Sequence, residues 1–398
     1  MLVVNAGSSS LKLTLIACEA GAEGGDRGPH GGEGPHGGEG PCAQEPLAER
    51  ELDAPGAQID PAQLHDALAA GLGEADAVGH RIVHGGERHR DAVVIDGRVE
   101  RELRALVELA PLHQPKSLAA LDAVSEELPG LPAVACFDTA FHATLPAAAS
   151  TYALPREWRE RWAIRRYGFH GLSHAWVTRR VGQLAGASAG ARERRGLRLV
   201  SCHLGAGASL CAIRDGRSLD TTMGFTPLEG LVMATRSGSV DPGLLTWLLT
   251  PSGDGEQRLT SAELADALEH RSGLLGLAGS ADMREVLARA QDGERDARLA
   301  LDAYVHRLRA SIAAMSAALG GLDALAFTGG VGERSHEVRA LAVEGLEFLG
   351  VQLDEQRNRA ARGDAAIGAE RAAALVFVVS AREDLEIARQ VSCVLSRR

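Results

Sequence analysis

Two short loops rich in glycine and serine, each following an apolar run, constrain the fold of this chain more than any other feature. Residues 5–10 follow the run Leu2–Val4, and residues 204–209 follow the run Leu197–His203. Each loop leads into another apolar run, which predicts a strand, a tight bend and a second strand. Since both halves then continue with further strands and helices, the pattern predicts an α/β protein built from a duplicated unit, with a cleft between the halves.

Further elements follow from the spacing of apolar residues. Short apolar runs predict strands over 131–137, 210–213, 217–222, 324–327 and 374–379. Apolar residues three and four apart predict helices over 101–109, 117–127, 298–319 and from Ser335. Residues 19–46 contain a Pro-His-Gly-Gly-Glu-Gly repeat and predict a flexible surface insertion.

Composition excludes several classes of protein. Apolar residues make up 45% and charged residues 24% of the 398 residues, as in a soluble globular protein of about two domains. No run approaches the roughly 18 apolar residues of a membrane span, and the first residues do not read as a secretory signal. The net charge of −11 disfavours broad nucleic-acid binding. Six cysteines without a CxxC pair predict reduced thiols, and we expect a cytoplasmic protein without nucleic-acid or membrane partners.

Glycine-rich loops at three strand ends favour a phosphate ligand. Residues 5–10, 204–209 and 328–332 are the loops, and small residues let backbone N–H groups approach phosphate oxygens. The chain lacks a Walker pattern and lacks a GxGxxG sequence that opens a helix. A P-loop fold and a dinucleotide-binding fold are therefore disfavoured.

Several polar side chains near strand ends could carry chemistry. Arginine forks match carboxylate and phosphate oxygens, and carboxylates after buried strands often line a cleft. The candidates are Arg81, Arg236, His113, His170, His174, Asp138 and Glu383. Each of them alone has a structural interpretation, as an ion pair, a loop histidine or a helix cap.

Ten segments rich in glycine and polar residues lie in order along the chain: residues 5–12 (NAGSSSLK), 79–87 (GHRIVHGGE), 110–115, 137–142, 167–174 (YGFHGLSH), 223–231, 235–243, 280–284, 327–333 (FTGGVGE) and 383–388. Together these segments resemble the acetate kinase (acetokinase) family of short-chain carboxylate kinases. The resemblance covers nearly the whole chain.

The resemblance implies a duplicated actin/Hsp70/sugar-kinase-like (ASKHA) fold and a homodimer. It implies an actin-like domain at 1–145 plus 384–398 and a nucleotide-binding actin-like domain at 146–383. It also implies direct in-line transfer of the γ-phosphoryl group of ATP to acetate, giving acetyl phosphate and ADP in a reversible reaction, as in acetyl-CoA biosynthesis. The implied metal ion is Mg²⁺, with Mn²⁺ as the alternative.

Site residues follow from the resemblance, position by position. The implied catalytic residues are Arg81, Asp138, His170 and Arg236. The implied substrate-binding residues are Arg81, Val83, Leu112, His113, Phe169 and Pro227, and the implied metal ligands are Asn5 and Glu383. The implied nucleotide-binding residues are Lys12, His203, Leu204, Gly205, Ala206, Gly207, Asp282, Met283, Arg284, Thr328, Gly329, Gly330, Val331 and Gly332.

Elementary chemistry agrees with these roles. A carboxylate nucleophile is ionised at neutral pH, so the reaction needs no general base. Its difficulty is the approach of two anions, which cationic groups such as Arg81 and Arg236 relieve. We therefore expect Asp138 to orient an arginine or a metal-bound water.

Three alternatives remain open. A propionate or butyrate kinase of the same family differs by about 1–3 kcal/mol per methylene in an apolar pocket. A non-catalytic actin-like nucleotide-binding module would not need Arg81, His170 and Arg236 together. A sugar kinase would use Asp138 as a base.

Four departures from the family pattern stand out. Ala206 and Gln114 each replace an asparagine, and Ser239 replaces an aspartate. The insertion after Cys18 is atypical. We expect Ala206 to affect the binding or the identity of the phosphoryl donor, because it removes a side-chain amide.

Overall fold

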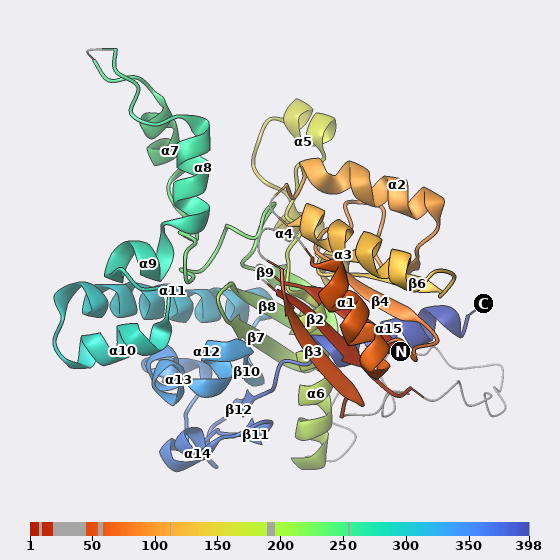
Figure 1. Ribbon diagram of the computed structural model, residues 1–398. Coiled ribbons are helices and arrows are strands. Elements are labelled where there is room, and N and C mark those ends of the chain that lie inside the picture. Colours follow the sequence, from red (N-terminus) through yellow and green to blue (C-terminus); the bar gives the residue numbers. More distant parts are fainter. Residues whose placement is uncertain are drawn as a thin grey trace. The chain divides into compact units, whose positions relative to one another are not determined.

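The structure is a computed structural model that describes residues 1–7, 10–18, 45–54, 59–111, 113–188, 196–253 and 255–397. Most of the predicted insertion (residues 19–44) and Leu112 lie outside the described residues. The chain forms two compact units (Figure 1). Unit 1 comprises residues 1–143, 169–179 and 382–398, and unit 2 comprises residues 144–168 and 180–381.

Unit 1 contains a six-stranded sheet in the order β3-β2-β1-β4-β6-β5. Its strands are β1 (Leu2–Ala6), β2 (Ser10–Leu15), β3 (Ala48–Asp53), β4 (Val78–Ile82), β5 (Val93–Val94) and β6 (Ala133–Phe137). The first three strands form an antiparallel meander, β1, β4 and β6 run parallel to one another, and β5 is antiparallel to β6.

Unit 2 repeats this sheet strand for strand. Its order is β11-β12-β10-β7-β8-β9. The strands are β7 (Arg198–Leu204), β8 (Ala208–Arg214), β9 (Arg217–Thr221), β10 (Ala324–Thr328), β11 (Ala365–Ala366) and β12 (Leu375–Val378). Again an antiparallel meander is followed by two parallel strands and one antiparallel edge strand. The prediction of a duplicated α/β unit is therefore confirmed.

Helices cover these sheets. Those in unit 1 are α1 (Pro61–Ala67), η2 (Leu68–Leu72), α2 (Gly97–Ala105), η3 (Leu106–Glu108), α3 (Gln114–Glu127) and α15 (Glu383–Leu395). The chain passes from unit 1 to unit 2 within η4 (Ala140–Thr144) and within α6 (Gly171–Ser188). Those in unit 2 are α4 (Ala147–Ser150), α5 (Arg156–Trp162), α7 (Pro242–Leu249), α8 (Ser261–His270), α9 (Gly273–Ala278), α10 (Met283–Gln291), α11 (Arg295–Leu319), α12 (Gly329–Arg334), α13 (His336–Val343), η5 (Glu347–Leu349) and α14 (Glu355–Ala360).

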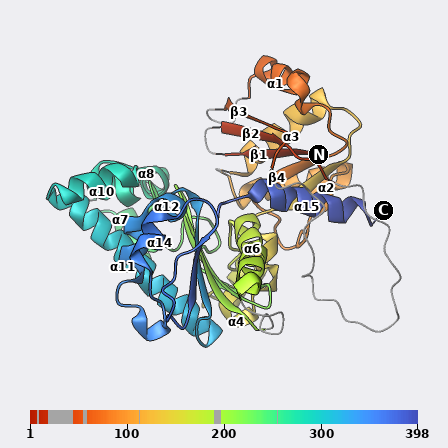
Figure 2. The same cartoon turned by 90° about the horizontal axis from the view of Figure 1, so that it is seen from below.

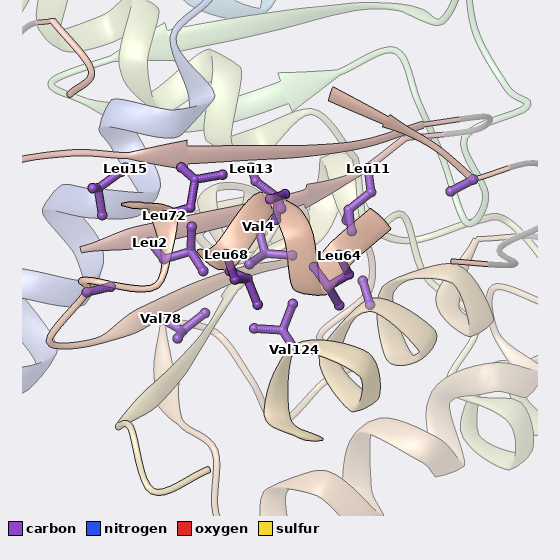
Figure 3. Close-up of a cluster of buried hydrophobic side chains, with 14 residues drawn as sticks. Leu2, Val4, Leu11, Leu13, Leu15, Leu64, Leu68, Leu72, Val78 and Val124 are labelled. Carbon is purple, nitrogen blue, oxygen red and sulfur yellow. The ribbon is translucent and has the colours of Figure 1, made fainter. Parts of the chain in front are cut away.

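An apolar cluster holds one face of the unit 1 sheet against its helices (Figure 3). Leu2 and Val4 alternate along β1 and meet Leu64 of α1 and Val124 of α3, each at most 1% exposed. Burial of such a side chain contributes about 1.5–3 kcal/mol, so this cluster fixes the register of the strands.

The side chains of β4 point alternately to the two faces of the unit 1 sheet. Val78 packs in the cluster with Val124 of α3, whereas a Cβ atom on Gly79 would lie 2.6 Å from Ile387 of α15. Successive side chains of a strand point to opposite faces. His80 therefore shares the face of α3, and Arg81 shares the face of α15, which lies beside β4 in Figure 2.

One cysteine corrects the expectation of reduced thiols. Cys18 is disulfide-bonded, because sequence spacing does not reveal which cysteines the fold brings together. Among the described cysteines, Cys136, Cys202, Cys211 and Cys393 form no disulfide bond. Among the described residues, no helix is both long enough and apolar enough to cross a membrane.

Candidate functional site

Arg81 and Asp138 form the centre of a polar cluster in unit 1. Arg81 is the fourth residue of β4, and Asp138 directly follows the parallel strand β6. Parallel strands end at the same edge of a sheet, so the two side chains meet there. The Arg81 Nε donates to Asp138 Oδ2 over 3.1 Å, and Nη2 donates to the same oxygen over 2.7 Å. Asp138 thus pairs with an arginine, and its role in the reaction stays a prediction.

Asn5 and Glu383 complete the cluster. Arg81 Nη1 donates to Asn5 Oδ1 over 3.0 Å, and Asn5 Nδ2 donates to Glu383 Oε2 over 3.2 Å. Glu383 Oε2 lies 3.9 Å from Arg81 Nη1. The end of β1, the end of β4 and the start of α15 thus bring together two acids, one amide and one guanidinium, although Asn5 and Glu383 are 378 positions apart.

Burial sets the electrostatics of this cluster. Burial raises the pKa of the Asp138 carboxyl, and Arg81 opposes that rise through its charge and its hydrogen bonds. Burial also opposes the charge on Arg81, but Asp138 and Glu383 raise the pKa of Arg81 on balance. Arg81 therefore stays cationic, and its charge opposes the loss of charge on Asp138 that burial favours.

The segment before α6 closes tightly over this cluster. The Gly171 N–H donates to the Asp138 carbonyl over 2.9 Å, and a Cβ atom on Gly171 would lie only 2.1 Å from that oxygen. His170 has a φ of +55°, which is uncommon for a residue other than glycine. Such backbone strain gathers at functional sites because the surrounding contacts must impose it.

Phe169 and His84 lie next to each other beside this segment. Their rings meet edge to face with centroids 5.7 Å apart, and Phe169 is 2% exposed. His142 Nε2 lies 2.9 Å from the Phe169 carbonyl oxygen, which holds Phe169 in place. Val83 follows β4 and is half-buried. Leu112, the other predicted apolar residue of unit 1, lies outside the described residues.

Gln114, which stands where the family pattern has asparagine, has a structural role in unit 1. Its side chain is fully buried, accepts from the His84 N–H over 3.2 Å and donates to the His84 carbonyl over 3.3 Å. A shorter asparagine would reach less far toward this turn. His113 precedes Gln114 at the start of α3 and is near enough to lower the pKa of Asp138 by its charge.

In unit 2, the structure brings together two glycine loops. The loop after β7 closes with a bond from the Gly205 N–H to the Gly207 carbonyl over 2.9 Å. Gly329 follows β10 with a φ of +79°, and a Cβ atom there would lie 2.8 Å from the Leu204 carbonyl oxygen. Residues 203–207 and 328–332 are therefore neighbours. The Thr328 hydroxyl is buried and has no hydrogen-bond partner among the described residues.

Arg236 has a partner that the sequence did not indicate. Its Nε lies 2.7 Å from Glu269 Oε1 of α8, and its Nη1 donates to the Pro227 carbonyl over 3.4 Å. Ser239, a further departure, accepts from the Gly230 N–H over 3.0 Å through its hydroxyl. Ala206 accepts from the Ala234 N–H over 3.1 Å with its backbone carbonyl.

Two predicted groups lie on partly exposed surface. Lys12 Nζ is 3.1 Å from Glu49 Oε1 and its side chain is 43% exposed. Asp282 caps the start of α10 and bonds to Arg284, whose side chain is 88% exposed, while Met283 is buried. The hydrogen bond from Arg284 lowers the pKa of Asp282.

Comparison with known proteins identifies the family. The model of the acetokinase family matches residues 57–389. The chain belongs to the acetokinase family. It is 43% identical over 335 residues to an acetate kinase of Dictyoglomus thermophilum, covering 84% of this chain and 82% of that one. The predicted family and enzyme class, a phosphotransferase with a carboxylate acceptor, are therefore confirmed.

Solved structures confirm the fold. An acetate kinase of Porphyromonas gingivalis superimposes with a TM-score of 0.82 at 33% identity, covering 99% of each chain. A propionate kinase of Francisella tularensis superimposes with a TM-score of 0.80 at 32% identity, covering 98% of each chain. The duplicated α/β fold is thus the fold of this family.

Two acids in unit 2 were missed by sequence reasoning. Glu269 holds Arg236, and Glu333 Oε1 accepts from the N–H groups of both Gly329 and Ala381, each over 3.0 Å. Glu333 thereby joins the ends of β10 and β12. It stands in the quoted FTGGVGE segment, so its motif position was a signal, whereas nothing in the local sequence marks Glu269.

Proposed function

We propose that this chain transfers the γ-phosphoryl group of ATP to acetate, in the reversible reaction that yields ADP and acetyl phosphate. The observation that carries the proposal is the buried cluster of Arg81, Asp138, Asn5 and Glu383, together with family membership. A fixed guanidinium in that cluster is suited to an anionic acceptor.

The hydrogen bonds of Arg81 leave room for one carboxylate. Arginine has five N–H groups. Nε and one N–H of Nη2 serve Asp138, and one N–H of Nη1 serves Asn5. One N–H on each Nη therefore remains, and two such groups match the two oxygens of a carboxylate. Asp138 acts as a positioning residue in this scheme, because it orients the fork without accepting a proton from the acceptor.

The proposed roles of the remaining site residues of unit 1 follow from their positions near the Arg81 guanidinium. Phe169 and Val83 would limit the acyl chain, with Leu112 and His113 as further substrate contacts. His170, in its strained conformation next to Asp138, would donate to the transferring phosphoryl group. Its positive φ supports this role, because the fold imposes the strain at that residue.

The chemistry of Asn5 and Glu383 fits Mg²⁺. Magnesium prefers oxygen ligands and usually takes one or two carboxylates besides water and substrate phosphates. Glu383 offers a carboxylate and Asn5 an amide oxygen in one cluster. When bound, the ion would offset negative charge on the phosphates. Mn²⁺ would satisfy the same ligands.

Unit 2 supplies the residues that we propose for ATP. The neighbouring loops 203–207 and 328–332 present backbone N–H groups, and the buried Thr328 hydroxyl offers one more polar group. Met283 with its neighbours Asp282 and Arg284, and Lys12 of unit 1, are further nucleotide contacts in this proposal. Arg236 would stabilise the charge that develops during transfer, held by Glu269 and beside Pro227.

A propionate kinase is the second candidate, favoured by the fit to the Francisella tularensis propionate kinase. The test is a coupled assay with ATP, Mg²⁺ and acetate, propionate or butyrate, read as kcat/KM for each acid. We expect acetyl phosphate formation and the highest kcat/KM for acetate. A higher value for propionate would support the second candidate, and no acyl phosphate from any of the acids would refute both.

We also propose that the chain acts as a homodimer in the cytoplasm, where ATP is available. Support for the dimer comes from α7, which has Leu244, Leu245, Trp247, Leu248 and Leu249 but no buried residue. An apolar helix that buries none of its side chains marks an interaction surface. Figure 1 shows α7 beside α8, away from the sheet of unit 2.

A further inference from the structure

Glu229 of unit 2 is held by two side chains that the proposed function does not use. It lies in the segment that follows β9, two residues after Pro227. Its Oε1 accepts from Arg166 Nη2 over 2.7 Å, and its Oε2 accepts from the Tyr152 hydroxyl. Both carboxylate oxygens are therefore bound, one by a guanidinium and one by a phenol, in hydrogen bonds that the charge strengthens.

The Tyr152 hydroxyl connects Glu229 to the backbone of the same segment. Tyr152 follows α4, which lies beside β9 (Figure 1). Its hydroxyl accepts from the Phe225 N–H over 2.9 Å and donates to Glu229. Burial and the bond to Glu229 raise the pKa of this phenol, so it keeps the proton that it donates. A Cβ atom on Gly224 would overlap the hydroxyl and the carboxylate, so the segment packs directly against both groups.

Arg166 holds the first residues of the segment. Its side chain is 17% exposed, and its Nη2 is bound to Glu229. Its Nη1 donates to three successive backbone carbonyl groups, those of Thr221, Thr222 and Met223, over 3.1, 3.2 and 3.0 Å. The rigid fork of an arginine can serve several acceptors in fixed directions. One guanidinium therefore holds both ends of residues 221–229.

The same segment holds the chain that enters unit 1. The N–H groups of Tyr167 and Gly168 donate to the Gly224 carbonyl over 3.0 and 3.1 Å. Tyr167 is 5% exposed, and its ring centroid lies 6.0 Å from that of Phe225. Gly168 ends a segment of unit 2, and Phe169 begins a segment of unit 1. The position of Gly224 therefore fixes the backbone that directly precedes Phe169.

We propose that Tyr152, Glu229 and Arg166 are positioning residues that set the length of the acid that this enzyme accepts. They act through Pro227, which lies between two residues bound to Tyr152, and through Phe169. A closely packed and hydrogen-bonded segment resists the displacement that an additional methylene group requires. The inference rests on the proposed function, because Pro227 and Phe169 are substrate contacts in that proposal.

The decisive variant is Tyr152→Phe, which removes one hydroxyl and keeps the ring. It deprives the Phe225 N–H and Glu229 Oε2 of their partner, so the segment should yield to a longer acid. The measured quantity is the ratio of kcat/KM for the acid one methylene longer to kcat/KM for the preferred acid. We expect this ratio to rise about three- to ten-fold, a part of the roughly 10- to 200-fold discrimination that an apolar pocket gives per methylene. The KM for ATP should not change.

The ratio distinguishes positioning from general destabilisation, because a loss of folded enzyme lowers kcat for both acids alike. The matched control is Tyr304→Phe, which removes a buried hydroxyl of unit 2 that has no hydrogen-bond partner among the described residues. It should leave the ratio unchanged. Glu229→Gln removes the charge that both partners bind and should raise the ratio, as Tyr152→Phe does. An unchanged ratio for Tyr152→Phe, or an equal rise for Tyr304→Phe, would overturn the proposal.

Hydrogen exchange, read by mass spectrometry, tests the network without the reaction. We expect faster exchange over residues 164–168 and 221–230 in Tyr152→Phe than in the unmodified chain, and no such change in Tyr304→Phe. Unchanged exchange in Tyr152→Phe would overturn the proposal even for an active enzyme. If the unmodified chain formed no acyl phosphate, the proposed function and the role in the choice of acid would both fail, whereas faster exchange would still show that the network holds the two segments.

Discussion

At the scale of single residues, Arg81 shows how a side chain can be held in place and still remain available. Three of its five N–H groups are used by Asp138 and Asn5, and the other two donate to no described residue, although Nη1 lies 3.9 Å from Glu383 Oε2. Its side chain is 17% exposed, so a ligand can reach it. In the proposed function the guanidinium would thus be fixed before the carboxylate arrives, which would lower the cost of ordering it.

Replacing Arg81 tests this role. Arg81→Ala removes the donors and leaves Asp138 as an unpaired buried carboxylate, so we expect kcat/KM for acetate to fall by roughly 100- to 1,000-fold. Steady-state kinetics measure the effect, and circular dichroism checks the fold. The matched control is Arg88→Ala, because Arg88 is 80% exposed and paired with Glu102 in the same unit. Similar kinetics for the two variants would contradict the assignment.

His80 makes the free energy of unfolding depend on pH. Its pKa is about 4 in the folded chain against 6.5 when solvated, so the unfolded chain binds more protons between these values. The stability contribution of the neutral ring is therefore complete above pH 6.5 and is lost as the pH falls toward 4.

Between pH 7 and pH 5 this loss amounts to about 2 kcal/mol for one histidine. For His80→Leu, the free energy of unfolding should therefore fall by about 2 kcal/mol less between these pH values than for the unmodified chain. Urea unfolding at both pH values measures the difference. The other titrating groups are common to both proteins and cancel in the difference. Parallel stability profiles for the two proteins would show that His80 is not buried as a neutral ring.

Sequence reasoning at this scale found residues and missed their partners. Arg81, Asp138 and Asn5 lie in segments that resemble the family pattern, so they could be predicted as site residues from the sequence. The partner of Arg236 was not, because Glu269 lies in α8, where an acid is ordinary on a helix that is mostly exposed. Likewise, the lack of a hydrogen-bond partner for His80 among the described residues depends on the packing of α3 against β4, and no local pattern records that.

At the scale of elements, the start of α6 fixes the distance between two functional segments. Gly171 donates its N–H to the Asp138 carbonyl, and the space for a side chain there is absent. The strained His170 precedes it directly. The fold thus uses the first residue of one helix to set both the end of β6 and the conformation of His170.

Two glycine-to-alanine substitutions in α6 distinguish the effect of this contact from the effect of helix propensity. Gly171→Ala places a methyl group against the Asp138 carbonyl, so we expect about 1–3 kcal/mol of destabilisation and a lower kcat. A Cβ atom on Gly182 would meet nothing within 4 Å. Gly182→Ala should therefore raise the stability by up to about 1 kcal/mol and leave kcat unchanged.

Thermal unfolding and acetyl phosphate formation measure the two effects. If Gly171→Ala matched Gly182→Ala in both, the close approach at Asp138 would have no functional importance.

Element positions were otherwise well predicted where the pattern was strong, as for α11 and the hairpin of β8 and β9. The short elements β5, β11 and α12 were missed because two to six residues carry no periodicity.

At the scale of the whole molecule, the duplication was predictable because both copies keep a glycine loop inside their first hairpin. The assignment of residues 169–179 to unit 1 was not, since these residues follow 25 residues of unit 2 in the chain. Only the packing of Leu172 with Leu385 and Ile387 shows where they belong. Domain borders at this level depend on contacts that local sequence does not encode.

The homodimer is the remaining proposal at this scale, and the exposed side chains of α7 test it. Trp247 is 55% and Leu244 is 45% exposed, and both belong to one apolar helix of unit 2. Charges there would have to be desolvated in an interface. We therefore expect the double variant Leu244→Glu and Trp247→Glu to be monomeric at concentrations at which the unmodified chain is dimeric, measured by light scattering during gel filtration.

The matched control is Phe348→Glu, because Phe348 is 74% exposed as an isolated side chain of the same unit. A mass of one chain for the unmodified protein, or a dimer that survives the double variant, would exclude α7 as the interface.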